Sequence, residues 1–158
     1  MRKFHRKKGQ RRAFLKGLAN NFRLKKAGLG RALGDLEKNI MDILWLRGEA
    51  TGKEIFSEIM QSRNIAITTV LTVLERLAKK GIVRKTKGER VYVYVPAFTK
   101  AEFTDMVSQE VMKGIMDISA SSAVASLVDI LADTDPHELD RLSKLIEKKK
   151  KEIRQKAG

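Results

Sequence analysis

Residues 66–95, AITTVLTVLERLAKKGIVRKTKGERVYVYV, carry the strongest structural signal in this chain. The apolar residues of the first half are three and four positions apart, as on the buried face of an α-helix: Val70, Val73, Leu74 and Leu77. Gly81 fits the end of that helix. From residue 91 to residue 95 valine alternates with tyrosine, which is typical of a β-strand with one buried side. Residues 82–86 can pair with this strand through the polar turn 87–90, so the stretch predicts a helix followed directly by a β-hairpin.

The exposed side of this helix is predicted to carry hydrogen-bond donors, several of them cationic. They are Thr68, Thr69, Thr72, Arg76 and Lys79. Three threonines within five residues lower the helix propensity, so one is expected to cap the helix and the others to contact phosphates and base edges. A helix of this kind fits the major groove of DNA, and the hairpin can reach the adjacent backbone. We expect further DNA contacts from four cations at the end of the helix and in the hairpin: Lys80, Lys85, Lys87 and Arg90.

Two further helices are predicted before this stretch. The first spans residues 35–47. Thr51 and Glu54 have the spacing of a capping box, which opens a second helix that runs to about Ser62. Its buried side is expected to consist of Ile55, Phe56, Ile59 and Met60. Helix, helix, turn, helix and hairpin is the order of a winged helix-turn-helix, which we place at residues 33–97.

Residues 98–158 are predicted to form a helical dimerisation region. Thr99 and Asp135 mark two helix starts, and the serine-rich stretch 119–122 is expected to loosen or break the helix between them. A stripe of aliphatic residues recurs along this region: Leu127, Leu131, Leu139, Leu142 and Ile146. A segment of this length cannot enclose its own apolar face, so pairing with a second copy of the chain is expected. The alternative is that these helices pack on the winged helix of the same chain.

Composition argues against several classes of protein. The chain has no cysteine and only two distant histidines, His5 and His137, so neither a disulfide nor a metal site is expected. It has no phosphate-binding glycine-rich loop and no Ser/His/acid set, so we expect neither an enzyme nor a bound cofactor. No run of apolar residues reaches the roughly 18 that a membrane span requires. We therefore expect a soluble, cytoplasmic protein that does not enter a membrane.

The net charge of +14 is unevenly distributed along the chain. Residues 1–34 contain twelve Lys/Arg and no Asp/Glu, whereas the remaining 124 residues are close to neutral. We define residues 1–32 as a basic N-terminal arm. Such an arm can be a solvated tail, or it can bind nucleic acid by releasing the counterions of phosphates. Several apolar residues interleaved with the cations favour the second interpretation: Phe4, Phe14, Leu15, Leu18 and Phe22.

From Leu33 to about Lys149 the chain resembles the penicillinase-repressor family, the BlaI/MecI/CopY type of bacterial winged-helix repressors. The resemblance rests on three segments: IAITTVLTVLERLAKKGIVRK (65–85), GERVYVYVP (88–96) and DPHELDRL (135–142). It implies a homodimer that binds a pseudo-palindromic operator on double-stranded DNA and blocks transcription. It also implies that the recognition-helix positions of the family fall on Thr68, Thr69, Thr72 and Arg76.

Two features depart from the family pattern. Penicillinase-type members are inactivated by cleavage at an Asn-Phe bond in the dimerisation region, where this chain reads VSQEVM (107–112). Copper-responsive members carry a C-terminal cysteine motif, and this chain has no cysteine. The resemblance therefore does not indicate the inducing signal. The arm, in turn, resembles the N-terminal tail of a bacterial large-subunit ribosomal protein of the seventeenth class, which implies an RNA contact.

The sequence thus predicts a sequence-specific DNA-binding transcriptional regulator, a repressor that acts as a homodimer. The alternative from another class is an RNA- or ribosome-associated binding protein whose main contact is the arm. A third interpretation is a winged helix used as a protein-interaction module. Selection from a pool of random duplexes separates the first two, because only the first enriches an inverted repeat.

Overall fold

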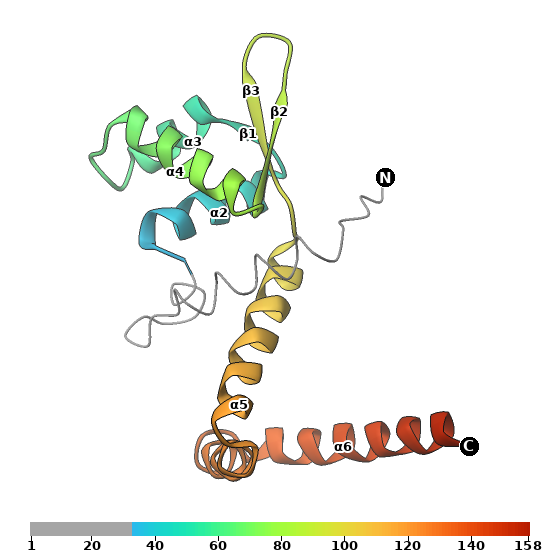
Figure 1. Cartoon of the computed structure of the whole chain (residues 1–158). Coiled ribbons are helices and arrows are strands. Elements are labelled where there is room, and N and C mark those ends of the chain that lie inside the picture. Colours follow the sequence, from blue (N-terminus) through green and yellow to red (C-terminus); the bar gives the residue numbers. More distant parts are fainter. Residues whose placement is uncertain (1–32) are drawn as a thin grey trace. The chain divides into compact units, whose positions relative to one another are not determined.

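The computed structural model describes residues 33–158, and its elements carry the labels of Figure 1. In chain order they are α2 (Asp35–Arg47), β1 (Ala50–Thr51), α3 (Gly52–Ile59), α4 (Ile67–Lys79), β2 (Val83–Lys87), β3 (Tyr92–Pro96), α5 (Lys100–Thr134) and α6 (Pro136–Ala157). The basic arm, with its predicted nucleic-acid contact, lies outside the described residues. Those residues divide into two compact units, the body (residues 33–111) and the tail unit (residues 112–158). The fold is mainly helical with a small antiparallel sheet, as predicted.

The sheet of the body has three antiparallel strands in the order β1-β3-β2. β2 and β3 form the predicted hairpin, which is the wing, with Lys85 opposite Tyr94 and Lys87 opposite Tyr92 (Figure 1). β1 pairs Ala50 with Tyr94 on the other edge of β3. The sequence did not indicate β1, because a strand of two residues has no periodicity to detect.

The helices α2, α3 and α4 pack with the sheet around one hydrophobic core. Fully buried side chains of this core come from each of these helices, from β2 and the residue before it, and from the start of α5. Among them are Ile40, Leu44, Ile55, Val70, Leu74, Leu77, Ile82, Val83 and Phe103. The predicted buried side of α3 is wrong at Met60, which is 41% exposed because the helix ends one residue before it. On β3 the buried residue is Tyr94, whereas Val91 precedes the strand and is 57% exposed. The alternation in the sequence therefore located the strand but did not identify its buried side.

Local signals determine the helix ends that position α4 and the wing. The predicted capping box of α3 is confirmed: Thr51 Oγ1 accepts the N–H of Glu54 at 3.3 Å, and Glu54 Oε2 accepts the N–H of Thr51 at 2.7 Å. Gly81 follows the end of α4 with a φ of 74°, a conformation that favours glycine. The N–H of Ile82 donates to Leu77 O at 3.0 Å, which is the long hydrogen bond of a Schellman motif. The chain therefore turns from α4 directly into β2.

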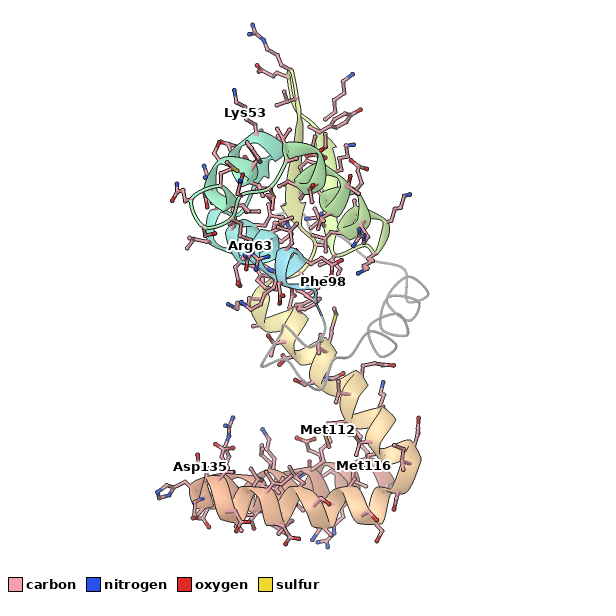
Figure 2. The ribbon with its side chains drawn as sticks, turned by 90° about the vertical axis from the view of Figure 1, so that its left-hand side faces the viewer. Lys53, Arg63, Phe98, Met112, Met116 and Asp135 are labelled. Atoms are coloured by element: carbon pink, nitrogen blue, oxygen red, sulfur yellow. The ribbon has the colours of Figure 1, made fainter. Side chains whose placement is uncertain are left out.

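The first turns of α5 belong to the body. Phe103 and Val107 are buried in its core, and the ring of Trp45 on α2 lies 5.6 Å from that of Phe103. Trp45 Nε1 donates to the carbonyl oxygen of Phe98 at 2.9 Å, and Figure 2 labels Phe98 at this junction. The boundary between the two units therefore falls inside α5, whereas the sequence suggested one after residue 97.

In the tail unit α5 is broken at Ser119, whose φ of −164° and ψ of 106° are not helical. This confirms the predicted break in the serine-rich stretch. Ser119 Oγ accepts the N–H of Ser122 at 3.2 Å, which caps the helical segment that follows. α6 begins where the sequence predicted: Asp135, labelled in Figure 2, accepts the N–H of His137 through Oδ1 at 3.2 Å.

The apolar character of α5 exceeds what the sequence suggested. The helix spans 35 residues, and its most apolar stretch has a mean hydropathy of 1.6 with 6% of that stretch buried. By length and composition alone α5 could cross a membrane, although no uninterrupted apolar run indicated this. Its exposed apolar side chains therefore require a cover, which either a partner chain or a lipid could supply.

Candidate nucleic-acid interface

The exposed face of α4 carries the side chains that the sequence predicted for DNA contact. All five of the predicted residues on this helix are exposed: Thr68, Thr69, Thr72, Arg76 and Lys79. The opposite face is buried against α3 and the rest of the core. Gly52 at the start of α3 permits the close approach, because a Cβ atom there would lie only 2.5 Å from Leu71 Cδ2. α3 and α4 thus form a helix-turn-helix whose second helix presents its polar face to solvent.

The threonines of α4 do not cap the helix, and the predicted cap role of one of them is wrong. The N-cap residue is Ala66, which makes no side-chain cap bond. Thr72 Oγ1 donates to the carbonyl oxygen of Thr68 at 2.8 Å, one turn earlier. Among residues 33–158, the hydroxyls of Thr68 and Thr69 make no hydrogen bond. These two hydroxyls are therefore available to an external acceptor or donor.

Lys80, predicted to contact DNA, is engaged within the chain. Its Nζ donates to Glu37 Oε1 at 2.9 Å, and Glu37 is only 7% exposed. Glu37 Oε2 accepts the N–H of Gly34 at 3.1 Å. Burial raises the pKa of Glu37, but the hydrogen bonds from Lys80 and Gly34 outweigh burial and hold that pKa below its ordinary value. Lys80 therefore ties the end of α4 to the start of α2, which leaves it less available to a phosphate.

Lys85 lies in a cluster that joins the wing to α4. Its Nζ forms an ion pair with Glu75 Oε1, which also accepts the hydroxyl of Tyr94 at 3.2 Å. The same Nζ lies 4.2 Å from the ring centroid of Tyr92, within the range of a cation–π interaction. The hydrogen bond between them lowers the pKa of Glu75 and raises the pKa of Lys85, so both groups are charged at neutral pH. Lys85 thus neutralises the carboxylate that α4 carries beside its donor face.

The remaining predicted wing cations, Lys87 and Arg90, are exposed at the turn of the hairpin. Gly88 lets this turn close: its N–H donates to Val91 O at 2.9 Å, and a Cβ atom at Gly88 would lie 2.7 Å from that oxygen. Val91 and Tyr92 are 57% and 52% exposed beside the turn. The wing tip therefore combines two exposed cations with exposed apolar surface.

Two further exposed cations flank the helix-turn-helix, and the sequence prediction missed both. Lys53 lies in the first turn of α3, and Arg63 lies in the turn between α3 and α4 (Figure 2). The first helix of a helix-turn-helix crosses the DNA backbone, so cations on it and on the turn are candidates for phosphate contacts. The sequence did hold a signal for both: Lys53 lies within the predicted capping box, and Arg63 lies in the predicted turn of the helix-turn-helix.

Two other features of the body were candidates for a ligand site: clusters of carboxylates and a pocket. Within residues 33–158, no group of three or more His, Asp or Glu side chains is arranged to hold a metal ion. An open pocket between α2 and α3 is lined by Asp42 and Glu58. Both carboxylates are already paired, Asp42 with Lys38 and Glu58 with Arg47. The exposed face of α4 and the wing is therefore the candidate interface of the body.

Comparison with known proteins identifies the family. Residues 33–148 match the family model described as penicillinase repressor. The chain belongs to the penicillinase repressor family. It is 33% identical over 115 residues to the transcriptional regulator BlaI of Mycobacterium tuberculosis, an alignment that covers 72% of this chain and 82% of that regulator. It is 25% identical over 122 residues to the penicillinase repressor of Bacillus licheniformis, covering 76% of this chain and 95% of that repressor.

The chain is also similar to a solved structure of the Bacillus licheniformis BlaI monomeric form in complex with the blaP half-operator. The alignment covers 44% of this chain and 85% of the BlaI chain in that structure. Its sequence identity to this chain is 28%, and the TM-score is 0.40. The penicillinase repressor region of the present chain begins at Leu33, a buried core residue, and ends inside α6. α4 and the wing therefore lie within the family region, whereas the arm and residues 149–158 lie outside it.

Proposed function

We propose that the chain is a DNA-binding transcriptional repressor that reads its operator with α4 and contacts the adjacent backbone with the wing. The exposed face of α4 carries this proposal. Thr68 and Thr69 present free hydroxyls there, Arg76 presents a guanidinium, and the one carboxylate of the helix is neutralised by Lys85. Arginine can donate two hydrogen bonds to a guanine, and threonine can contact a base edge or a phosphate. Membership of the penicillinase repressor family supports the same function.

We infer that the repressor is a homodimer held by the tail unit. α6 buries none of its 22 residues. Of the predicted dimer residues, Leu127, Leu131, Leu139 and Leu142 are half-buried, and Ile146 is 45% exposed. More exposed apolar side chains extend this predicted set: Ile118, Val124, Val128, Ile130, Leu145 and Ile153. A second copy of the chain would cover the part of this surface that stays exposed within residues 112–158.

A second copy suits this surface better than a lipid bilayer. α5 is broken at Ser119, and the part of it in the tail unit carries Asp117 and Asp129. A carboxylate inside a bilayer costs several kcal/mol. Since the family consists of transcriptional regulators, we propose a soluble cytoplasmic dimer rather than a membrane-spanning protein.

Selection from a pool of random duplexes tests the proposed function. The full chain should enrich an inverted repeat whose half-sites lie about 10 base pairs, or a multiple of that, apart, because a two-fold dimer places two copies of α4 in successive major grooves. Failure to enrich any duplex sequence would contradict the proposal.

The second candidate function, RNA binding, is favoured by the arm, which holds twelve Lys/Arg and no Asp/Glu before residue 34. A pool of structured RNA is therefore included in the same selection. Enrichment of RNA alone would replace the repressor by an RNA-associated protein. Enrichment of both pools would assign duplex DNA to α4 and RNA to the arm, which deletion of residues 1–32 would then separate.

A further inference from the structure

The net positive charge of this chain lies outside the region that matches the family. The matched residues 33–148 contain 16 Lys/Arg and 18 Asp/Glu, a net charge of −2. The ten residues that follow contain five Lys/Arg and one glutamate, a net charge of +4. The last turns of α6 are therefore a cationic extension of a family region that is itself slightly acidic.

Three of the lysines in α6, two at the end of the matched region and one beyond it, form a line along one side of the helix. Lys144, Lys148 and Lys151 are four and three residues apart, so they share one face and span about 10 Å of helix. We call them the lysine line. All three are exposed, and none has an ion-pair partner among residues 33–158. Leu142 lies two residues before Lys144, about 200° around the helix, so the apolar side of α6 faces away from this line.

The neighbouring lysines are in a different environment. Lys149 Nζ lies 3.0 Å from Glu152 Oε2, and Lys150 Nζ lies 3.1 Å from Glu147 Oε1. Both charges are balanced by carboxylates on the same helix. The lysine line therefore combines regular spacing with charges that no carboxylate balances. Lys149 and Lys150 do not share this combination.

We propose that the lysine line binds the phosphate backbone of duplex DNA without reading its sequence, as a second contact in addition to α4 and the wing. Lysine is a flexible point charge that suits phosphates at variable positions, and each contact gains free energy by counterion release. The inference rests on the proposed function, which supplies the DNA and the dimer. When a second copy covers the apolar side of α6, the opposite side stays exposed. A lipid surface would bind the apolar side of α6 and would therefore compete with the second copy of the chain. In the dimer only the lysine side is exposed, and duplex DNA can bind there without displacing the second copy.

Two charge-matched variants of the full chain test this proposal on a duplex that lacks the operator. K144Q/K148Q/K151Q removes the lysine line, and the control K149Q/K150Q/K156Q removes the same charge elsewhere on α6. Glutamine is a good helix former, so both variants should keep the helix. We expect the slope of log K against log salt to flatten by about 0.9 for each lost phosphate contact, hence by about 2–3 in the first variant and by less than about 1 in the control. Light scattering checks that both variants keep the oligomeric state of the parent.

Equal slopes for the two variants, or no change in either, would overturn the proposal. Binding of the same variants to vesicles of phosphatidylserine and phosphatidylcholine is measured in parallel. If only vesicle binding is lost in K144Q/K148Q/K151Q, the lysine line serves a lipid surface and the proposal is overturned. The ratio of affinities for selected and scrambled duplexes should equal that of the parent in both variants. If no operator can be selected, the proposed function fails, whereas the slope comparison still tests the lysine line.

Discussion

Arg76 is the side chain of α4 best suited to read a base, because its guanidinium is exposed and can donate two hydrogen bonds to O6 and N7 of guanine. Arg76→Ala should weaken binding to the selected operator by about 1–3 kcal/mol. It should leave the melting temperature unchanged, since Arg76 is not part of the core. Binding isotherms on the operator and on a scrambled duplex measure the effect.

Arg63→Ala is the matched control for Arg76→Ala. Arg63 lies in the turn before α4, where we expect a phosphate contact that does not depend on sequence. Its removal should weaken binding to both duplexes by the same factor. If Arg76→Ala also weakens both duplexes equally, Arg76 is a phosphate contact and does not specify the operator.

Glu37 should make the stability of the body depend on pH. Its pKa is lowered in the folded chain, so the carboxylate stabilises the fold above its ordinary pKa of 4.5, and this contribution is lost as the pH falls through the folded pKa. Glu37→Gln should lower the free energy of unfolding at pH 7 by about 1–2 kcal/mol, because Lys80 then loses its charged partner. Urea unfolding at pH 7 and pH 3 measures this difference. A difference that stays the same at pH 3 would contradict the role of the ionised carboxylate.

The exposed donors of α4 could be predicted because helical periodicity separates a buried face from an exposed one within a single segment. The partners of Lys80 and Lys85 could not. Glu37 lies 43 residues from Lys80, and Glu75 lies 10 residues from Lys85 in a different element. A charge read from the sequence alone appears free, and only the packing of α2, α4 and the wing shows which cations are already paired.

At the level of the elements, the Glu75 and Lys85 pair couples the wing to α4. Glu75→Gln would release the Lys85 ammonium from its carboxylate, while the Tyr94 hydroxyl can still donate to the amide oxygen. If Lys85 then turns to a phosphate, affinity for random duplex should rise and the slope of log K against log salt should steepen by about 0.9. A salt titration on a scrambled duplex measures this slope.

Glu89→Gln is the control for the wing, because it removes a carboxylate from the exposed turn of the hairpin. It should leave the slope unchanged, since no lysine is released. A slope that does not change in Glu75→Gln either would show that Lys85 stays on the rings of Tyr92 and Tyr94 and does not contact DNA.

The elements that the sequence predicted well are those with local signals at their ends. The capping box at Thr51 and the caps at Thr99 and Asp135 each appear in the structure where the sequence placed them. β1 was missed, and the buried side of β3 was not identified, because both depend on strand pairing between Ala50 and Tyr94 across more than 40 residues. Tertiary pairing of this kind leaves no mark in a short window of sequence.

The assembly of two chains depends on the tail unit. Replacing Leu145 and Ile146, which are 54% and 45% exposed, with aspartate should yield monomers, because the pairing would bury four charges. The control places aspartate at Lys151 and Gln155, which are exposed on the side of α6 opposite Leu142 and Ile146, and should remain dimeric. Light scattering at micromolar concentration gives the masses. A monomeric parent chain would contradict the proposed dimer.

Protection of guanine N7 from methylation on the selected operator tests whether the dimer places α4 in the major groove. Guanine N7 is exposed in that groove, so two copies of α4 should protect guanines in two clusters about one helical turn, or a multiple of it, apart. Titration of the operator should show one dimer for each pair of clusters, and Arg76→Ala should lose protection in both. Tight binding without protection of any guanine N7 would show that the protein holds only the backbone, and would contradict the reading of the operator by α4.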